Sequence, residues 1–250
     1  MDLKGKTALV TGGAVRVGKA VTLAFAREGC NVVVNYRSST DAAEKTCREA
    51  RDLGVDALAV QADVGNHEDV KHMVAQAVDQ FGGIEILVNS ASLWLATPFP
   101  MEDLSDWHKV TNILINGSFY CANEVAPLML AAGEGAMINI IDLAAFEPWK
   151  NFIAHSVGKT ALLALSRQLA LELAPTVRVN AVAPGPVLPP PDYDEKKVAR
   201  TAKRTLMNRW GTAEDVAEAV IYFARADYVT GEVLRVDGGE HFGHRKPEFG

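Results

Sequence analysis

Short apolar runs and longer amphipathic stretches alternate along the 250-residue chain. The apolar runs are rich in β-branched residues and do not alternate strictly with polar positions, which is typical of parallel strands buried on both faces. They predict strands at residues 7–11, 31–36, 56–61, 85–90, 136–142, 177–182 and 232–237. The amphipathic stretches predict helices near residues 17–28, 41–53, 66–80, 103–131, 153–173 and 212–225.

This order of strands and helices favours an α/β fold, with a single doubly wound, Rossmann-type domain over residues 1–250. The expected core is a seven-stranded, mostly parallel sheet flanked by helices. One stretch is irregular: residues 184–197 contain five prolines, which do not fit inside a helix or a central strand. We expect a substrate-side loop and short helix at about 186–207, able to close over a ligand.

Composition narrows the class of protein. The net charge of −6, with acidic and basic residues mixed, argues against a nucleic-acid-binding surface. No apolar run approaches the roughly 20 residues of a membrane span, and the first residues lack a signal peptide. Three cysteines without metal-like spacing, and His67 and His72 five residues apart, predict no metal site. We expect a cytoplasmic protein that binds neither nucleic acid nor membrane and acts on a small-molecule substrate.

The stretch "VTGGAVRVGKA" (10–20) directly follows the first predicted strand and opens the first helix. In that position Gly12, Gly13 and Gly18 allow a tight turn, and the helix N-terminus offers free N–H groups to a phosphate. A plain strand–helix turn is the alternative interpretation. The place of the motif in the chain favours a nucleotide site.

The end of the second strand, "NYRSS" (35–39), indicates which nucleotide binds. An acidic residue there would bind the ribose of NAD, whereas a basic one holds a 2′-phosphate. The acid is absent, Arg37 is followed by Ser38 and Ser39, and Arg16 adds a second cation. NADP(H) is therefore the expected cofactor, the alternative being a solvated surface arginine.

Over nearly its whole length the chain resembles the short-chain dehydrogenase/reductase family. The resemblance rests on the glycine loop, "NYRSS", Asp63-Val64, "NSA" (89–91), Asn180 with Pro184-Gly185, and "TGEVLRVDGG" (230–239). It implies a hydride-transferring oxidoreductase with a Rossmann core, usually a homotetramer. The cofactor-binding residues it implies, together with the motifs above, are Gly12, Arg16, Val17, Tyr36, Arg37, Ser38, Ser39, Asp63, Val64, Asn89, Ser90, Ala91, Lys159, Pro184, Gly185 and Val187.

The family's catalytic set is only partly present. It comprises Ser, Tyr and Lys, with Tyr and Lys four residues apart, and a helix Asn. Lys159 matches the lysine, but His155 stands in the tyrosine position and Asp142 in the serine position. Leu114 falls where the asparagine belongs. Two nearby asparagines, at 112 and 116, can replace it only if the helix register shifts.

Asp at the serine position resembles the pteridine reductase branch of the family. That branch also has a basic residue in the glycine loop, as Arg16 is here, and Ala-Ser after the asparagine stretch, as in Ala91-Ser92. Its ring-stacking aromatic corresponds to Trp94, and Trp149 is a second candidate for substrate contact. His155 departs from this branch too.

His155 and Lys159 share one helix face, so both can point into one cleft. A free histidine side chain titrates near ~6.5 and tyrosine near ~10, so histidinium is the stronger acid. Imidazole is shorter than phenol, however, and needs a deeper substrate or a relaying water. In this interpretation His155 or water supplies the proton, Asp142 orients it and Lys159 holds the nicotinamide ribose. Alternatively His155 only packs at the helix start.

Three functions stay open on the sequence alone. The first is an NADP(H)-dependent reductase of a C=O or C=N group, on a pterin-like or other flat ring. The second is a catalytically silent NADP(H)-binding protein, acting as a sensor or assembly subunit. The third is a 3-oxoacyl or sugar-ketone reductase. Residues 161–173 are apolar over most of the helix circumference, which favours contact with another subunit and a homotetramer.

Overall fold

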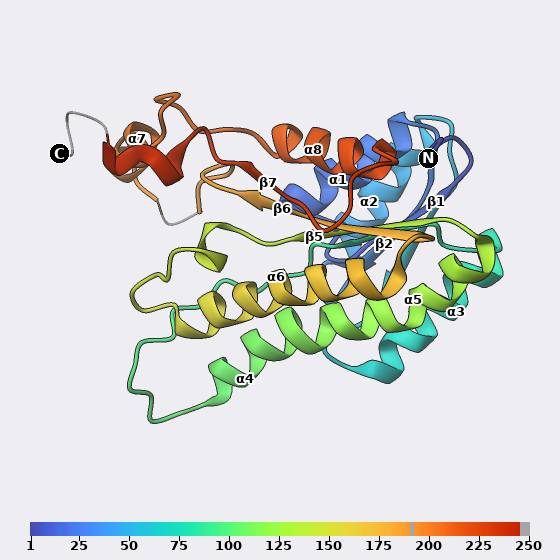
Figure 1. Cartoon of the computed structure of the whole chain (residues 1–250), viewed down its shortest axis with the longest axis horizontal. Coiled ribbons are helices and arrows are strands. Elements are labelled where there is room, and N and C mark those ends of the chain that lie inside the picture. Colours follow the sequence, from blue (N-terminus) through green and yellow to red (C-terminus); the bar gives the residue numbers. More distant parts are fainter. Residues whose placement is uncertain (191–192, 246–250) are drawn as a thin grey trace.

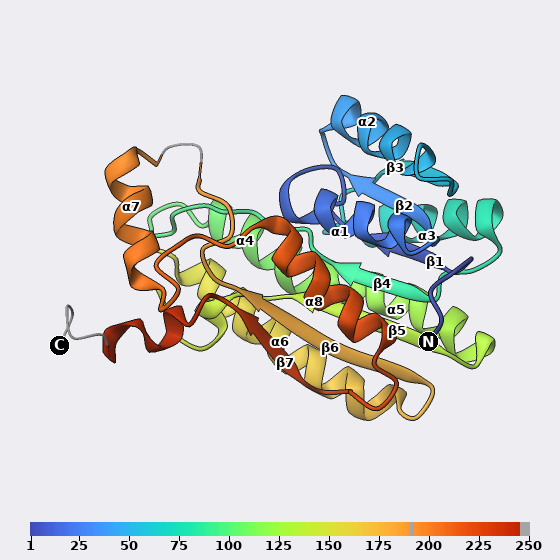
Figure 2. The same ribbon diagram turned by 90° about the horizontal axis from the view of Figure 1, so that it is seen from above.

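The computed structural model describes residues 1–190 and 193–245. Within these residues, seven parallel strands form one sheet in the order β3-β2-β1-β4-β5-β6-β7 (Figures 1 and 2). The strands are β1 (Thr7–Val10), β2 (Asn31–Tyr36), β3 (Ala57–Gln61), β4 (Ile86–Asn89), β5 (Gly135–Ile140), β6 (Val177–Pro184) and β7 (Val233–Val236). The order reverses between β1 and β4, where the carboxyl ends of the strands open a crevice for a ligand.

Helices cover both faces of the sheet, in three layers (Figure 1). The first face carries α1 (Arg16–Arg27), α2 (Thr40–Arg51) and α8 (Ala213–Arg225), and the second carries α3 (His67–Phe81), α5 (Ser118–Ala132) and α6 (Ile153–Leu173). The two largest apolar clusters among the described residues lie between these helix layers and the sheet. The Rossmann-type fold expected from the sequence is confirmed. None of the described helices is long and apolar enough to cross a membrane.

The helix predicted at 103–131 is not continuous. It consists of α4 (Ser105–Thr111), a wider π-helical turn (Asn112–Gly117) and α5. Where the turn ends, Gly117 lies against Val64, and a Cβ at Gly117 would come within 2.9 Å of the Val64 side chain. Such π turns are frequent at functional sites. Apolar periodicity does not detect one inserted residue, so a single helix was the wrong prediction here.

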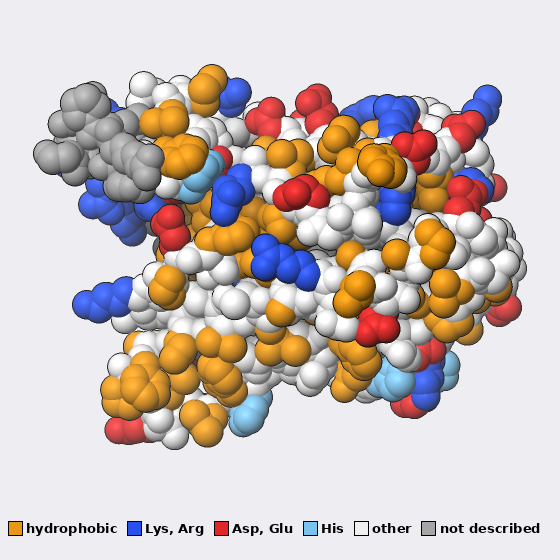
Figure 3. Space-filling model, viewed as in Figure 1, with side chains coloured by type: hydrophobic (Ala, Val, Ile, Leu, Met, Phe, Trp, Pro, Cys, Tyr) orange, Lys and Arg blue, Asp and Glu red, His pale blue; other side chains and the backbone are white. Residues whose placement is uncertain are grey.

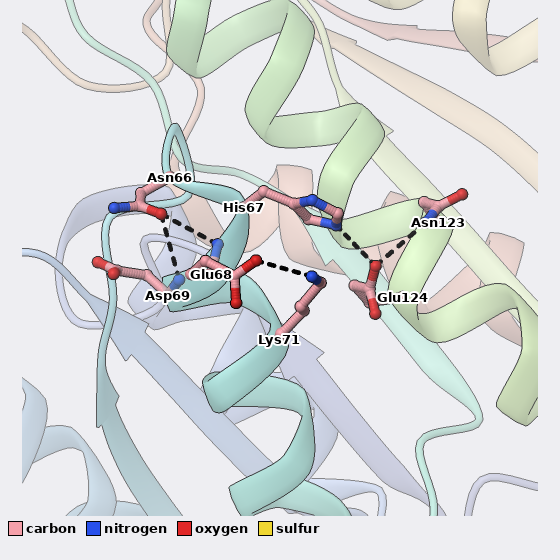
Figure 4. Close-up of polar contacts among 7 residues, drawn as sticks. All are labelled: Asn66, His67, Glu68, Asp69, Lys71, Asn123 and Glu124. Atoms are coloured by element: carbon pink, nitrogen blue, oxygen red, sulfur yellow. Dashed lines mark hydrogen bonds and ion pairs between the residues drawn. The ribbon is translucent and has the colours of Figure 1, made fainter.

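A polar cluster joins α3 to α5 (Figure 4). The Asn66 side chain caps α3 by accepting hydrogen bonds from the backbone N–H groups of Glu68 and Asp69. Next to it, His67 Nε2 lies 2.7 Å from Glu124 Oε1, and the imidazole stacks on Tyr120 at 4.7 Å. His67 therefore has a structural role at this helix contact.

The segment predicted to close over a ligand contains α7 (Glu195–Arg204). This helix stands beyond the carboxyl end of β6, away from the two helix layers (Figure 2). It contains no buried residue. The indole Nε1 of Trp210 donates to the carbonyl oxygen of Val198 at 2.9 Å and ties α7 to the following loop. A short 3-10 helix, η3 (Glu240–Arg245), packs beside α7.

Candidate active site

A cleft of about 910 Å³ lies at the carboxyl end of the sheet. Its walls come from the segments that follow β1, β2, β3, β4, β5 and β6, together with α6 and α7. Figure 3 shows the molecule hollowed between the part that carries α7 and the part that carries α4. This is the place at which the fold predicts a ligand.

At the nucleotide end of the cleft, backbone segments of the glycine loop pack closely against each other and against the segment after β4. Gly12 has a φ of +62°, and a Cβ there would come within 3.1 Å of the Cα of Ala91. A Cβ at Gly18 would collide with the carbonyl oxygen of Gly12. No side chain caps the N-terminus of α1, so its first N–H groups stay available to an anion. These features fit the pyrophosphate of a dinucleotide.

Arg37 is the cation that the structure leaves available at this end. Its side chain is 56% exposed, and among the described residues the carboxylate within ion-pair range is that of Asp63, 3.9 Å away. Arg16 also lines the cleft and makes a further contact. It adopts a left-handed backbone with φ +53°, a costly conformation for a residue other than glycine, and its guanidinium donates to the carbonyl oxygen of Leu188. Arg16 thus links the glycine loop to the loop after β6.

Most of the predicted cofactor residues line the cleft, and five do not. Asn89 is buried, and its amide nitrogen donates to the Asn139 side chain and, more weakly, to the Ser118 carbonyl oxygen. Val187 belongs to the hydrophobic core, and Tyr36 packs against it. Those that line it are Gly12, Arg16, Val17, Arg37, Asp63, Val64, Ser90, Ala91, Lys159, Pro184 and Gly185, whereas Tyr36, Ser38, Ser39, Asn89 and Val187 lie outside the lining.

Two site residues were missed in the sequence. Asn35, at the end of β2, accepts a hydrogen bond from the Gly12 N–H and donates to the Ala62 carbonyl oxygen. The hydroxyl oxygen of Thr11 accepts from the backbone N–H groups of both residues that follow β4, at 2.9 and 3.0 Å. Each is a polar residue in or next to an apolar strand, which is the signal that would have identified it.

The substituted catalytic residues do come together. His155 Nε2 lies 2.6 Å from Asp142 Oδ2. An ionised carboxylate only accepts hydrogen bonds, so Nε2 carries the proton of this contact. Asp142 Oδ1 accepts from the N–H of Ala144 and caps the short 3-10 helix after β5. The Nδ1 of His155 is buried and has no hydrogen-bond partner.

Aromatic side chains enclose His155. The imidazole stacks on Trp149, at 6.0 Å and 10° between planes, and meets the edge of Trp94 at 4.9 Å. As a result the His155 side chain is only 2% exposed, against 17% for Asp142. We expected His155 to present the proton and Asp142 to orient it. The carboxylate is the more accessible member of the pair, which favours the opposite division of roles.

Lys159 lies beneath this pair on α6. Its ammonium donates to the carbonyl oxygen of Ile140 at 2.7 Å. Burial lowers the pKa of Lys159 below its ordinary value, and the nearby Asp142 carboxylate opposes this change. A buried cation lining the cleft suits the ribose-binding role that the family resemblance implies.

The asparagine position is apolar, as the sequence suggests. Leu114 is fully buried, and a Cβ at Gly158 of α6 would come within 2.7 Å of it. The π turn does shift the helix register, but it brings neither neighbouring amide to Lys159. Asn112 donates to the carbonyl oxygen of Gly65, and Asn116 donates to Asn112.

A Rossmann-type sheet, a glycine-rich phosphate cradle and an acid–base pair beside a lysine define a nicotinamide-dependent oxidoreductase. The family model described as enoyl-(acyl carrier protein) reductase matches residues 13–241. The chain belongs to the short-chain dehydrogenase/reductase family, and it is an oxidoreductase acting on CH–OH groups.

Three similar proteins illustrate the relationship. The chain is 37% identical to a 3β-hydroxysteroid dehydrogenase of Eggerthella lenta, covering 95% of this chain and 94% of the relative. It is 36% identical to a 3-oxoacyl-[acyl-carrier-protein] reductase of Synechocystis, covering 95% and 97%. A blue fluorescent protein from a metagenomic library, solved in complex with NADPH, superposes with a TM-score of 0.88 at 30% identity, covering 96% and 99%.

These relatives correct the finer assignment to a branch. They are a hydroxysteroid dehydrogenase and a 3-oxoacyl reductase, and they support the family without supporting the pteridine reductase branch. That branch was suggested by three separate residue matches, at Asp142, Arg16 and Trp94. Single residues around a site can agree by chance, whereas similarity over the whole chain reflects the complete fold and site.

Proposed function

We propose that the protein uses NADPH to reduce the carbonyl group of a small-molecule substrate. The observation that carries this proposal is the 2.6 Å contact between His155 and Asp142 in the cleft, with Lys159 beside it. When bound, the nicotinamide supplies hydride to the carbonyl carbon. Preference for the phosphorylated cofactor is supported by Arg37 at the nucleotide end and by the related structure that contains NADPH.

In this proposal Asp142 is the group that passes the proton to the carbonyl oxygen of the substrate. In the loaded state the pair holds two protons, one on His155 Nε2 and one on the Asp142 carboxyl. As negative charge develops on the substrate oxygen, the carboxyl proton passes to that oxygen, and the Nε2–H of the neutral imidazole stabilises the ionised Asp142 that remains. Solvent then returns a proton to Asp142, the more exposed member of the pair. Trp94 and Trp149 keep the imidazole itself away from the substrate.

Of the possible substrates, a 3-oxoacyl thioester has the broadest support among the relatives. Several proteins 34–36% identical over more than nine tenths of the chain are 3-oxoacyl reductases. A cyclic ketone is the second candidate. Trp94 is half-exposed in the cleft and stacks on Phe152 at 4.4 Å, which gives a flat surface for a ring, and one relative is a 3β-hydroxysteroid dehydrogenase.

NADPH consumption tests the proposal directly. The purified protein is mixed with NADPH and, in separate assays, a 3-oxoacyl N-acetylcysteamine thioester, a 3-oxosteroid and dihydropterin. We expect turnover with a carbonyl substrate and a large loss of turnover in Asp142→Ala. Tight NADPH binding without turnover on any of these compounds would instead identify the silent cofactor-binding protein and overturn the proposal.

A further inference from the structure

The helix α7 concentrates positive charge in a chain that is acidic as a whole. Five of the 25 Lys and Arg residues lie in its ten positions, "EKKVARTAKR", with a single acidic residue, whereas the complete chain carries −6. Figure 3 shows Lys and Arg side chains gathered over this part of the molecule. A local excess of this kind raises the concentration of anions at the surface that carries it.

The positions along α7 decide which cations face the cleft. Thr201 and Arg204 line the cleft wall, and they are three residues apart on one helix face. Lys197 lies one turn before Thr201 on the same face, and its ammonium sits 5.4 Å from the ring centre of Tyr193, another lining residue. Arg200 flanks this face. The position of Lys196 is rotated about the helix axis by more than a right angle from the face that Lys197, Thr201 and Arg204 share.

Little negative charge neutralises this face. Arg204 pairs with Glu240 of η3 at 2.5 Å, and burial raises the pKa of that carboxyl. Elsewhere in the described part of the chain, no carboxylate lies within ion-pair range of Lys197 or Arg200. Lys150, on the loop after β5, also lines the cleft and is exposed. The substrate end of the cleft is thus bordered by several cations, of which Arg204 alone pairs with a carboxylate among the described residues.

These cations are distinct from those of the nucleotide end. Arg37 follows β2 and Arg16 lies in the glycine loop, whereas α7 follows β6. Lys197 and Arg204 are seven residues apart, or roughly 10 Å along a helix that rises 1.5 Å per residue. One carboxylate cannot span that length, but an arm with several phosphate groups can contact each cation in turn.

We propose that Lys197, Arg200 and Arg204, with Lys150 on the loop after β5, bind the phosphate groups of a thioester substrate of the coenzyme A kind. The inference rests on the proposed reduction of a 3-oxoacyl thioester. The acyl group would enter toward Asp142, and the phosphorylated arm would leave the cleft along α7. The positive charge of α7 would then favour substrates that carry phosphate groups at the end away from the acyl group.

Binding without chemistry tests this proposal separately from turnover. The protein is first saturated with NADP⁺, so that coenzyme A cannot occupy the nucleotide site, and is then titrated calorimetrically with coenzyme A or with pantetheine, which lacks phosphates. We expect coenzyme A to bind more tightly, and added salt to remove the difference because screening weakens exposed charges. Equal binding of the two compounds, or binding of neither, would overturn the proposal.

Matched variants locate the site. Lys197→Ala/Arg200→Ala should weaken coenzyme A binding by about 2- to 5-fold for each exposed cation removed, or roughly 10-fold together. Lys196→Ala removes one charge from the same helix on the face turned away, and it should bind coenzyme A as the parent does. Glu240→Gln releases Arg204 and should tighten binding. The single variant Lys197→Ala is its matched comparison, because each removes one charge. If Lys196→Ala weakens binding as much as Lys197→Ala does, helix charge in general is responsible and the proposed site is wrong.

Turnover gives an independent readout where the proposed function holds. The ratio of kcat/KM for a 3-oxoacyl coenzyme A to that for the matching N-acetylcysteamine thioester should exceed one, and should fall about 10-fold in the double variant. An unchanged ratio contradicts phosphate recognition. Absence of turnover on both thioesters contradicts the proposed function alone, since the calorimetric comparison still decides the binding site.

Discussion

The contact between His155 and Asp142 is the part of the site most open to direct test. In the proposed relay neither residue works without the other, so their effects on turnover should not add. The perturbation is a cycle of three variants: His155→Ala, Asp142→Ala and the double variant. Each single substitution should lower turnover by about 10²- to 10⁴-fold, the usual range for a positioned acid or base.

Stability loss must be separated from this effect, and the structure indicates its size. His155→Ala removes a hydrogen bond to a carboxylate, which contributes about 1.5–3 kcal/mol. It also removes two aromatic contacts, with Trp94 and Trp149, each contributing about 0.5–1.5 kcal/mol. The free energy of unfolding should therefore fall by about 2.5–6 kcal/mol, and Tm by roughly 5–24 °C.

The assay is NADPH oxidation measured well below the Tm of the weakest variant, with NADPH affinity determined in parallel by fluorescence. We expect nearly unchanged NADPH affinity, and a double variant no slower than the slower single variant. The relay is refuted if the two single losses multiply in the double variant, or if His155→Ala turns over as fast as the parent.

Three further predictions address the cofactor, the buried lysine and the assembly. Arg37→Asp should weaken NADPH binding at least about 10-fold while changing NADH binding much less, because only NADPH carries the 2′-phosphate; equal losses would contradict the assignment. Burial lowers the pKa of Lys159 from 10.5, so the unfolded chain binds more protons than the folded one between the lowered pKa and 10.5, and stability should rise with pH over that window. Lys159→Met should flatten this rise in denaturant titrations at about pH 7 and about pH 10, and an equally steep rise in the variant would show that other groups cause it. Leu171 on α6 is 75% exposed and Phe119 on α5 is also exposed, so the protein should sediment well above its 26.9 kDa chain mass; a monodisperse monomer at micromolar concentration would contradict the expected homotetramer.

Much of the fold could be predicted from the sequence because parallel strands and amphipathic helices leave strong local patterns. The strand at 31–36 and the helix at 153–173 are observed with the same limits as predicted. The π turn at 112–117 was not predicted, because it depends on a contact distant in the sequence, the packing of Gly117 against Val64, and not on local periodicity.

The candidate site was predictable to the level of residue identity, and less so in its geometry. The resemblance to the family placed Asp142, His155 and Lys159 in one cleft, as the structure has them. Residue spacing carries no information on accessibility, which here depends on Trp94, some sixty residues away in the chain, and on Trp149. Arg16 is a similar case: its charge predicts a phosphate ligand, whereas its contact with the Leu188 carbonyl oxygen is visible only in the structure.

The substitutions at 142 and 155 are best understood as one change. A tyrosine–serine pair is neutral, whereas a histidine–aspartate pair contains a charge that must be satisfied when it is buried. The structure meets this need with two donors on the carboxylate, the Ala144 N–H and His155 Nε2, and with the Lys159 ammonium nearby. Replacing only the tyrosine would leave the buried imidazole without a carboxylate partner. The two residues therefore depend on each other for stability as well as for the proposed proton transfer, which is why one cycle of variants tests both.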